Sequence, residues 1–265
     1  MPRRHSLTAS LAGVALFAAP IAADAHPHMF VDAKAEIIFN TDGNIAEIRN
    51  IWTFDEAFSA YAKQGLKHLP NGRLMPEALE ALAKVNIHSL ALYKFFTFIR
   101  RANKLEPIGD GAEQTLSDDG EHLTLTFSVK PATPLPTAQE PLTIALYDPE
   151  YFVAMAFVKE HPVKLVNAPA ACKHSLFTPT GLTPAAAALI ARVPVSQRVL
   201  PPELAAMTDG IENGIVIDCT GKSHETQMHA DKSGAETSAS HSPAPHSPAP
   251  NSSTNDWITR GKLPD

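Results

Sequence analysis

Residues 29–54 read MFVDAKAEIIF-NTDGN-IAEIRNIWTF, two strand-like runs joined by a polar turn. Apolar residues recur in rough alternation in the first run, as in a strand with one buried face. The pair Asp42-Gly43 between the runs is a strong hairpin signal. The stretch therefore predicts a β-hairpin with strands over 29–39 and 45–54.

A helical pattern follows this hairpin, with apolar residues at Ala57, Phe58, Tyr61, Ala62 and Leu66. The acidic pair Asp55-Glu56 before it suits a helix N-terminus. A second helix is predicted from Pro76 to about Leu90, because proline is favoured in the first helical turn. The aromatic stripe of Phe58 and Tyr61 is read as core packing.

Strand-like segments dominate the rest of the chain up to Cys219. They cover 93–101, both sides of Asp118-Asp119-Gly120, 142–147, 152–158, 163–166 and 215–219. Further helical patterns lie at 184–192 and 202–207. The sum is six to eight mostly antiparallel strands with two inserted helices. We therefore expect a sandwich-like α+β domain over 26–221.

The first 25 residues have the order of a secretory signal peptide. Arg3 and Arg4 precede an apolar run over 7–22, and Ala23-Asp24-Ala25 follows it. A small-residue triplet of this kind is a signal-peptidase site. The run is shorter than the about 20 apolar residues of a membrane-spanning helix. We expect cleavage after Ala25 and a soluble periplasmic product.

The charge of the chain limits its partners. It has 22 basic and 28 acidic residues, a net charge of -6. Nucleic acid and anionic membranes both attract basic proteins. The balance therefore argues against those partners and is mildly compatible with cations.

The chain has two cysteines, Cys172 and Cys219. In an oxidising compartment they are expected to pair. The alternative, a pair of soft metal ligands, is weaker because neither has a second Cys or His at metal-finger spacing.

The composition changes after the last strand-like segment. Residues 222–254 are mostly Ser, Ala, Pro, His and Thr, and contain a tandem repeat over 241–250. Such a segment buries too little surface to offset its ordering entropy, so we expect a disordered linker. A short C-terminal segment over 255–265 contains Trp257 and Ile258.

The expected cleavage makes His26 the first residue of the mature protein. Its α-amine and its imidazole could then chelate one metal ion, because an α-amine with a pKa near 7.7–8.0 deprotonates easily. His28 could add a second imidazole, which gives the T-shaped arrangement called a histidine brace. Asp32 is a possible extra oxygen ligand, but an ordinary strand-edge carboxylate is the preferred interpretation. Nitrogen ligands of this kind suit divalent copper, nickel, cobalt and zinc.

Two alternatives bear on this candidate site. The amino-terminal copper and nickel motif with His at position three needs deprotonated backbone amides, and Pro27 has no N–H, so that motif is excluded. The other is that His26 and His28 are solvated residues of a frayed terminus. On the residues alone these two readings are evenly balanced.

The tail could also bind metal. It carries four histidines, at His224, His229, His241 and His246. His-rich tracts bind metal weakly and concentrate it locally. The alternative is a polar linker in which the histidines are incidental.

Two further motifs are interpreted as structural. Asp148-Pro149-Glu150 follows a strand, and its carboxylates could form an acid–base pair. No nucleophile or partner His stands at a diagnostic spacing, so a turn capped by Asp148 is the preferred interpretation. Trp52-Thr53-Phe54-Asp55 is interpreted as a packing anchor and helix cap. We therefore do not expect an enzyme.

Three segments resemble a known family: residues 26–32, 52–56 and 147–152. Their order and spacing are similar to those of periplasmic proteins grouped as domain of unknown function 1007. The resemblance spans about His26 to Cys219 and implies an association with nickel, cobalt or zinc transport systems. It implies no biochemical activity, and the tail lies outside it.

Three hypotheses follow from the sequence. The first is a periplasmic metal-binding chaperone or accessory of a divalent-metal transporter, with nickel, cobalt, zinc or copper as the ion. The second is a protein–protein docking module of a transporter component with no metal of its own. A copper-dependent oxidase is the third and weakest, because nothing else in the chain looks catalytic.

Overall fold

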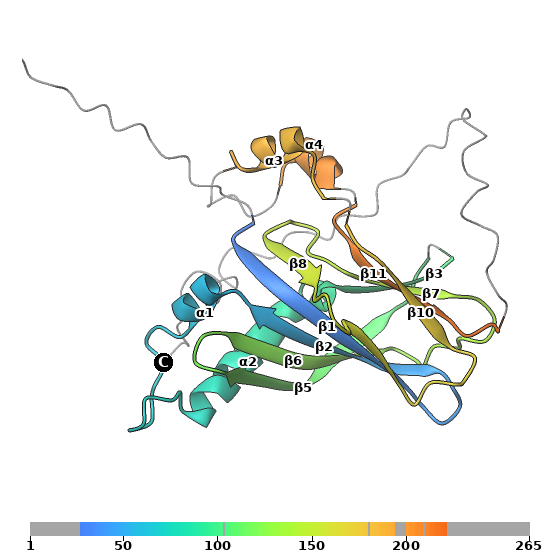
Figure 1. Cartoon of the computed structure of the whole chain (residues 1–265), viewed down its shortest axis with the longest axis horizontal. Helices are drawn as coiled ribbons and strands as arrows, with labels where there is room; N and C mark the ends of the chain where they lie inside the picture. Colours follow the sequence, from blue (N-terminus) through green and yellow to red (C-terminus); the bar gives the residue numbers. More distant parts are fainter. Residues whose placement is uncertain (1–26, 103, 180, 194–199, 209, 222–265) are drawn as a thin grey trace, which may run out of the picture.

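The computed structural model describes residues 27–102, 104–179, 181–193, 200–208 and 210–221. It is an α+β protein built on two β-sheets (Figure 1). The expected signal peptide, linker and C-terminal segment lie outside the described residues.

The first sheet has the strand order β5-β6-β2-β1-β8, and β9 pairs with β1 beyond β8. Its strands are β1 (Met29–Phe39), β2 (Ile45–Phe54), β5 (Ile108–Asp118), β6 (Leu123–Pro131), β8 (Val153–Phe157) and β9 (Val163–Val166). The hairpin predicted from Asp42-Gly43 is confirmed, since β1 and β2 pair antiparallel over almost their whole lengths. The contacts of β1 with β8 and β9 are parallel.

The second sheet has the order β10-β11-β7-β3-β4. Its strands are β3 (Thr97–Arg101), β4 (Lys104–Leu105), β7 (Leu142–Leu146), β10 (Lys173–Phe177) and β11 (Asn213–Asp218). All pairs in this sheet are antiparallel.

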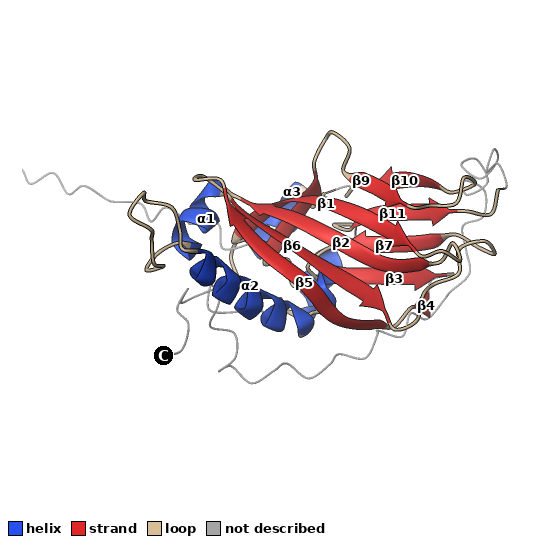
Figure 2. Ribbon diagram, turned by 90° about the horizontal axis from the view of Figure 1, so that it is seen from below, coloured by secondary structure: helices blue, strands red, loops and turns tan. Residues whose placement is uncertain are grey.

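Four α-helices occur in the described part of the chain. They are α1 (Glu56–Ala62), α2 (Pro76–Ala91), α3 (Pro184–Ile190) and α4 (Pro202–Ala205), and two short 3-10 turns cover Lys94–Phe96 and Ala206–Thr208. Figure 2 shows α1 and α2 against one end of the first sheet, with the second sheet toward the opposite end.

The long hairpin β1–β2 serves two hydrophobic cores. Met29, Val31 and Ala33 belong to a first core, which the first sheet forms with α2. Farther along the same strand, Ala35, Ile37 and Phe39 belong to a second core, between the two sheets. One face of β1 is therefore buried along its entire length, but against different partners in its two halves.

The α+β class, the mostly antiparallel pairing, the two inserted helices and the helical patterns at 184–192 and 202–207 are confirmed. Only the strand count is wrong, since the described residues form eleven strands where six to eight were expected. The strand expected over 93–101 begins with a 3-10 turn at Lys94–Phe96, where Phe95 has a φ of 54°. No strand was expected at the position of β10.

The expected disulfide is confirmed. Cys172 and Cys219 are joined by a 2.02 Å S–S bond. The bond ties the segment after β9 to the end of β11, and Cys219 is buried in the second core. Within the described ranges, no helix has the length and apolarity needed to cross a membrane.

Candidate functional site

The start of β1 lies beside the loop that joins β7 to β8. The backbone N–H of His28 donates a 2.9 Å hydrogen bond to the carbonyl of Phe152. The imidazole of His28 also packs against the Phe152 ring, with ring centroids 4.4 Å apart. Parallel pairing then continues from Met29 opposite Val153. The first and third of the three motifs therefore meet, although about 120 residues separate them.

Asp148 builds this loop. Its side chain is 2% exposed. One carboxylate oxygen accepts a hydrogen bond from the N–H of Glu150 at 2.9 Å, and the other accepts from Phe152 and Val153 at 3.0 Å each. The prediction that Asp148 caps a turn is confirmed. Through these hydrogen bonds, the Asp148 carboxylate holds Phe152 in the position where its ring contacts His28.

Asp55 fixes the same end of β1 from the other side. Its carboxylate accepts hydrogen bonds from the backbone N–H of Phe30 and of Phe58, both at 2.8 Å. Its own N–H donates to the Phe30 carbonyl at 3.0 Å. Asp55 is thus the N-cap of α1, as predicted, and it also holds the second residue of β1.

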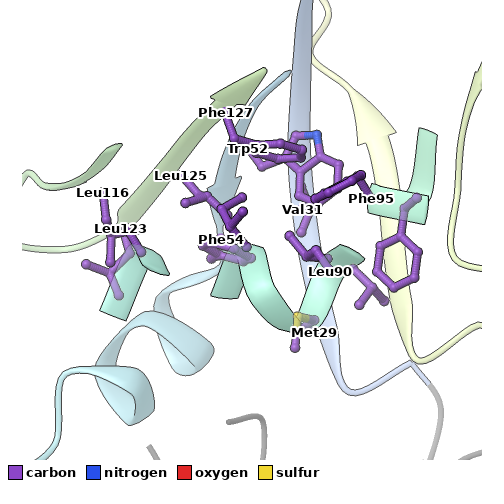
Figure 3. Packing of buried hydrophobic residues seen from close by; sticks show 14 of the residues in the cluster. Met29, Val31, Trp52, Phe54, Leu90, Phe95, Leu116, Leu123, Leu125 and Phe127 are labelled. Atoms are coloured by element: carbon purple, nitrogen blue, oxygen red, sulfur yellow. The ribbon is translucent and has the colours of Figure 1, made fainter. Parts of the chain in front are cut away.

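The middle motif supplies a packing anchor, as predicted. Figure 3 shows Trp52 and Phe54 among the side chains of the first core. The Trp52 ring meets Phe127 edge-on at 4.7 Å and is stacked on Phe96 at 6.3 Å. On the opposite face of β2, the Thr53 hydroxyl hydrogen-bonds the Thr124 hydroxyl at 3.0 Å.

The aromatic residues of α1 were predicted to pack in the core. This is confirmed for Phe58, which packs on the first core, whereas Tyr61 is 36% exposed.

The structure separates two of the candidate metal ligands. His28 is half-buried directly before β1, and Asp32 is exposed on that strand. Four residues of extended chain span about 13 Å, whereas ligand atoms lie about 2.0–2.2 Å from a zinc-type ion. His28 and Asp32 are therefore not brought together.

The other candidate ligands cannot be placed. His26, His224, His229, His241 and His246 fall outside the residues that the structure describes. Among the residues that are described, no group of three or more His, Cys, Asp or Glu side chains could hold a metal ion. Of the candidate ligands outside the described residues, His26 is the nearest to His28 in sequence.

A polar cluster that the sequence did not predict lies on the second sheet. A guanidinium nitrogen of Arg100 donates to the Tyr147 hydroxyl at 3.2 Å, and another lies 3.5 Å from the Glu212 carboxylate. Burial, and next the negative charge of Glu212, raise the pKa of Tyr147. Tyr147 begins the third motif, but its partners come from β3 and from the residue before β11. Only the assembled sheet brings them together.

Beside this cluster lies β10, an edge strand whose five residues are all exposed. Leu176 and Phe177 are each 39% exposed. The Phe177 ring lies directly over Gly214 of the neighbouring strand, where a Cβ atom would be 1.7 Å from the ring. This strand has no counterpart in the sequence prediction.

A comparison with curated proteins finds no match. A family model described as "Protein of unknown function (DUF1007)" matches residues 11–219. The matched range includes all three motifs that converge at the start of β1 and the disulfide that closes the second core. The chain therefore belongs to the DUF1007 family.

Proposed function

We propose that this protein is a periplasmic transition-metal-binding accessory or chaperone of a divalent-metal transport system. The nitrogen ligands of His26 and His28 would bind nickel, cobalt, zinc or copper. The observation that carries the proposal is the anchoring of His28 by the backbone hydrogen bond and ring contact with Phe152. That contact gives a short N-terminal chelate a fixed position on the folded body.

The position of His26 in the chain supports a shared site. Two residues span at most about 7 Å of chain, so His26 starts within reach of an ion held by the His28 ring. Pro27 lies between them and restricts the backbone. An α-amine and imidazole at His26, with the imidazole of His28, would supply three nitrogen ligands. Copper(II) binds such a set most strongly among these ions.

The proposal requires export and cleavage after Ala25. The disulfide is compatible with an oxidising compartment. The signal-peptide pattern of the first 25 residues supports the periplasm in particular. The four tail histidines, His224, His229, His241 and His246, would add weak sites that concentrate the ion near the N-terminus.

The test compares two forms of the processed chain, which differ by one residue at the N-terminus. One form starts at His26 and the other keeps Ala25, and both carry His→Ala changes at the four tail positions. Calorimetry with copper(II), nickel(II), cobalt(II) and zinc(II) measures the affinity of each form. We expect the extra residue to weaken binding at least tenfold, or about 1.4 kcal/mol, because it turns the amine ligand into an amide.

A matched control is His174→Ala, which removes an exposed imidazole from β10, far from the N-terminus in sequence. This variant should bind as the parent does. Equal binding by the two N-terminal forms would reject the amine as a ligand. No binding by either form would remove the metal proposal altogether.

The exposed edge of β10 favours a second candidate, a docking module for a transporter protein with no metal of its own. The free edge could accept one extended strand of that protein, and Leu176 and Phe177 would give it apolar contacts. Metal tolerance of cells deleted for the chain separates the candidates. If the metal proposal is right, His26→Ala/His28→Ala should fail to restore metal tolerance to these cells. If the docking proposal is right, Ser175→Pro should fail to restore it.

A further inference from the structure

A hollow with a volume of about 450 Å³ lies on the outer face of the second sheet. It is lined by residues of three strands and two adjoining segments: Arg100, Ala102, Thr143, Phe177 and Glu212. Arg100 and Thr143 stand opposite each other in the β3–β7 pair, and the next pair, Ile99 and Ile144, belongs to the second core. Because side chains alternate between the faces of a sheet, the hollow faces away from that core. Its volume lies within the range of about 300–1,000 Å³ that small-molecule sites have.

Phe177 forms the apolar wall of the hollow. Its ring lies over Gly214 of β11 and occupies the space that a side chain at that position would take. The ring is therefore seated against the sheet, although the residue remains 39% exposed. A side chain that is already in place loses little conformational freedom when a ligand packs on it.

Arg100 supplies the positive charge of the hollow. Its guanidinium donates to the Tyr147 hydroxyl at 3.2 Å, and its Cζ lies 6.0 Å from the centre of the Phe98 ring. A guanidinium has five N–H donors. Among the described residues, its hydrogen bonds reach only the Tyr147 hydroxyl and the Glu212 carboxylate. Arg100 is therefore held in place and still has donors for a ligand carboxylate, which a guanidinium binds well.

Glu212 supplies the negative charge, in a loose ion pair with Arg100. The nitrogen and oxygen atoms of the pair are 3.5 Å apart, and the two side chains are 25% and 31% exposed. Ion pairs that are partly exposed in this way contribute little to stability. A ligand that offers a partner to each charge can therefore separate the pair with little loss.

The neighbouring charges select the chemistry of the ligand. A simple anion would be repelled by Glu212, and a simple cation by Arg100. An α-amino acid carries a carboxylate and an ammonium on one carbon atom, so its two charges are also neighbours. We propose that this hollow binds a free α-amino acid with an apolar side chain. Its carboxylate accepts from Arg100, its ammonium donates to Glu212, and its side chain packs on Phe177.

This site uses neither His26 nor His28, so it is independent of the proposed metal site. The test measures binding of L-phenylalanine and L-leucine by calorimetry, on the chain that starts at His26. A chelator is present throughout, so that no metal-bound amino acid contributes. We expect saturable binding, with the largest changes of amide NMR shifts at Ala102, Thr143 and Glu212. No binding of either amino acid, or shifts confined to the first sheet, would overturn the proposal.

Two analogues of L-phenylalanine test the pairing of charges. 3-Phenylpropionate lacks the ammonium, and 2-phenylethylamine lacks the carboxylate. Each should bind at least tenfold more weakly than L-phenylalanine, because each leaves one charge of the hollow without its new partner. If either analogue binds as tightly as the amino acid, the zwitterion is not what the hollow recognises, and the proposal is wrong.

Two glutamate variants locate the site. Glu212→Gln keeps the size of the side chain and removes its charge, so it should weaken binding of L-phenylalanine at least tenfold. Glu36→Gln changes a matched pair on the first sheet, where Glu36 lies 3.0 Å from Arg49, and it should bind as the parent does. Unchanged binding by Glu212→Gln, or an equal loss in both variants, would contradict the assignment. If Glu212→Gln fails to fold, the comparison of the three ligands on the unsubstituted chain still decides the question.

Discussion

At the residue scale, two aspartates of the second and third motifs accept backbone hydrogen bonds near the start of β1. Asp148 is buried and Asp55 is half-buried. Asp148 accepts three backbone hydrogen bonds within its own loop, and Asp55 accepts two, from Phe30 and Phe58. Neither carboxylate is placed to act on a substrate by these contacts. Both position the backbone around the start of β1, directly after His28, so their effect on any N-terminal site is indirect.

Asp148→Ala should be strongly destabilising. The change leaves three backbone N–H groups near Phe152 without their acceptor, and hydrogen bonds to a charged group each contribute about 1.5–3 kcal/mol. We expect a loss of about 3 kcal/mol or more in the free energy of unfolding, measured by urea denaturation. Asp32→Ala, at an exposed position, should stay within about 0.5 kcal/mol of the parent. Similar losses in both variants would refute this role of Asp148.

The raised pKa of Tyr147 predicts a stability change at alkaline pH. Burial and the charge of Glu212 disfavour the phenolate in the folded state. As the pH rises above the usual tyrosine pKa of about 10, the unfolded chain loses this proton first, so stability falls. Tyr147→Phe should flatten the decline in unfolding free energy that begins near pH 10. Tyr61→Phe, at an exposed tyrosine, is the control, and an equal flattening there would contradict the assignment.

At the element scale, the sequence predicted best where a local signal decided the structure. The turn at Asp42-Gly43, the Asp55 cap and the proline at the start of α2 are local, and the elements they predict are present. The strand over Val163–Val166 was also predicted with its correct bounds.

The elements that were missed depend on distant partners. Lys173–Phe177 shows no clean alternation of apolar residues, and it forms a strand by pairing with β11. The parallel contact of β1 with β8 likewise joins segments more than 100 residues apart. For this reason the neighbour of His28, Phe152, could not be predicted from its own motif, although Asp148 was correctly read as a turn residue.

The pairing of β10 with β11 includes one close contact, between Phe177 and Gly214, whose contribution can be tested. Gly214→Ala adds a methyl group that would lie 1.7 Å from the nearest atom of the Phe177 ring, so the two would overlap. We expect a loss of about 1–3 kcal/mol, the usual cost of overpacking, together with faster amide exchange in β10. The same change in a Phe177→Ala background should cost much less. Equal costs in both backgrounds would show that the ring does not limit this position.

At the scale of the whole molecule, one hairpin carries two cores with different partners. The first core contains α2 and the aromatic cluster around Trp52, and the second contains both sheets and the disulfide. The N-terminal half of β1, which directly follows His28, belongs to the first core. The other half of β1 belongs to the second core, which also contains the disulfide.

This division predicts a local effect of removing the disulfide with Cys172→Ser/Cys219→Ser. The bond closes a loop of 47 residues, which corresponds to roughly 4 kcal/mol in the chain-entropy model. The bond restrains only β11 and the segment after β9, so amide exchange should accelerate most at Ile215 and Ile217 and least at Leu82 and Ile87 of α2. The proposed binding of metal at His26 and His28 should then change little in the folded protein. Equal acceleration in both cores would mean that the hairpin unfolds them as one cooperative unit, and the N-terminal site would then lose its anchor whenever the second core opens.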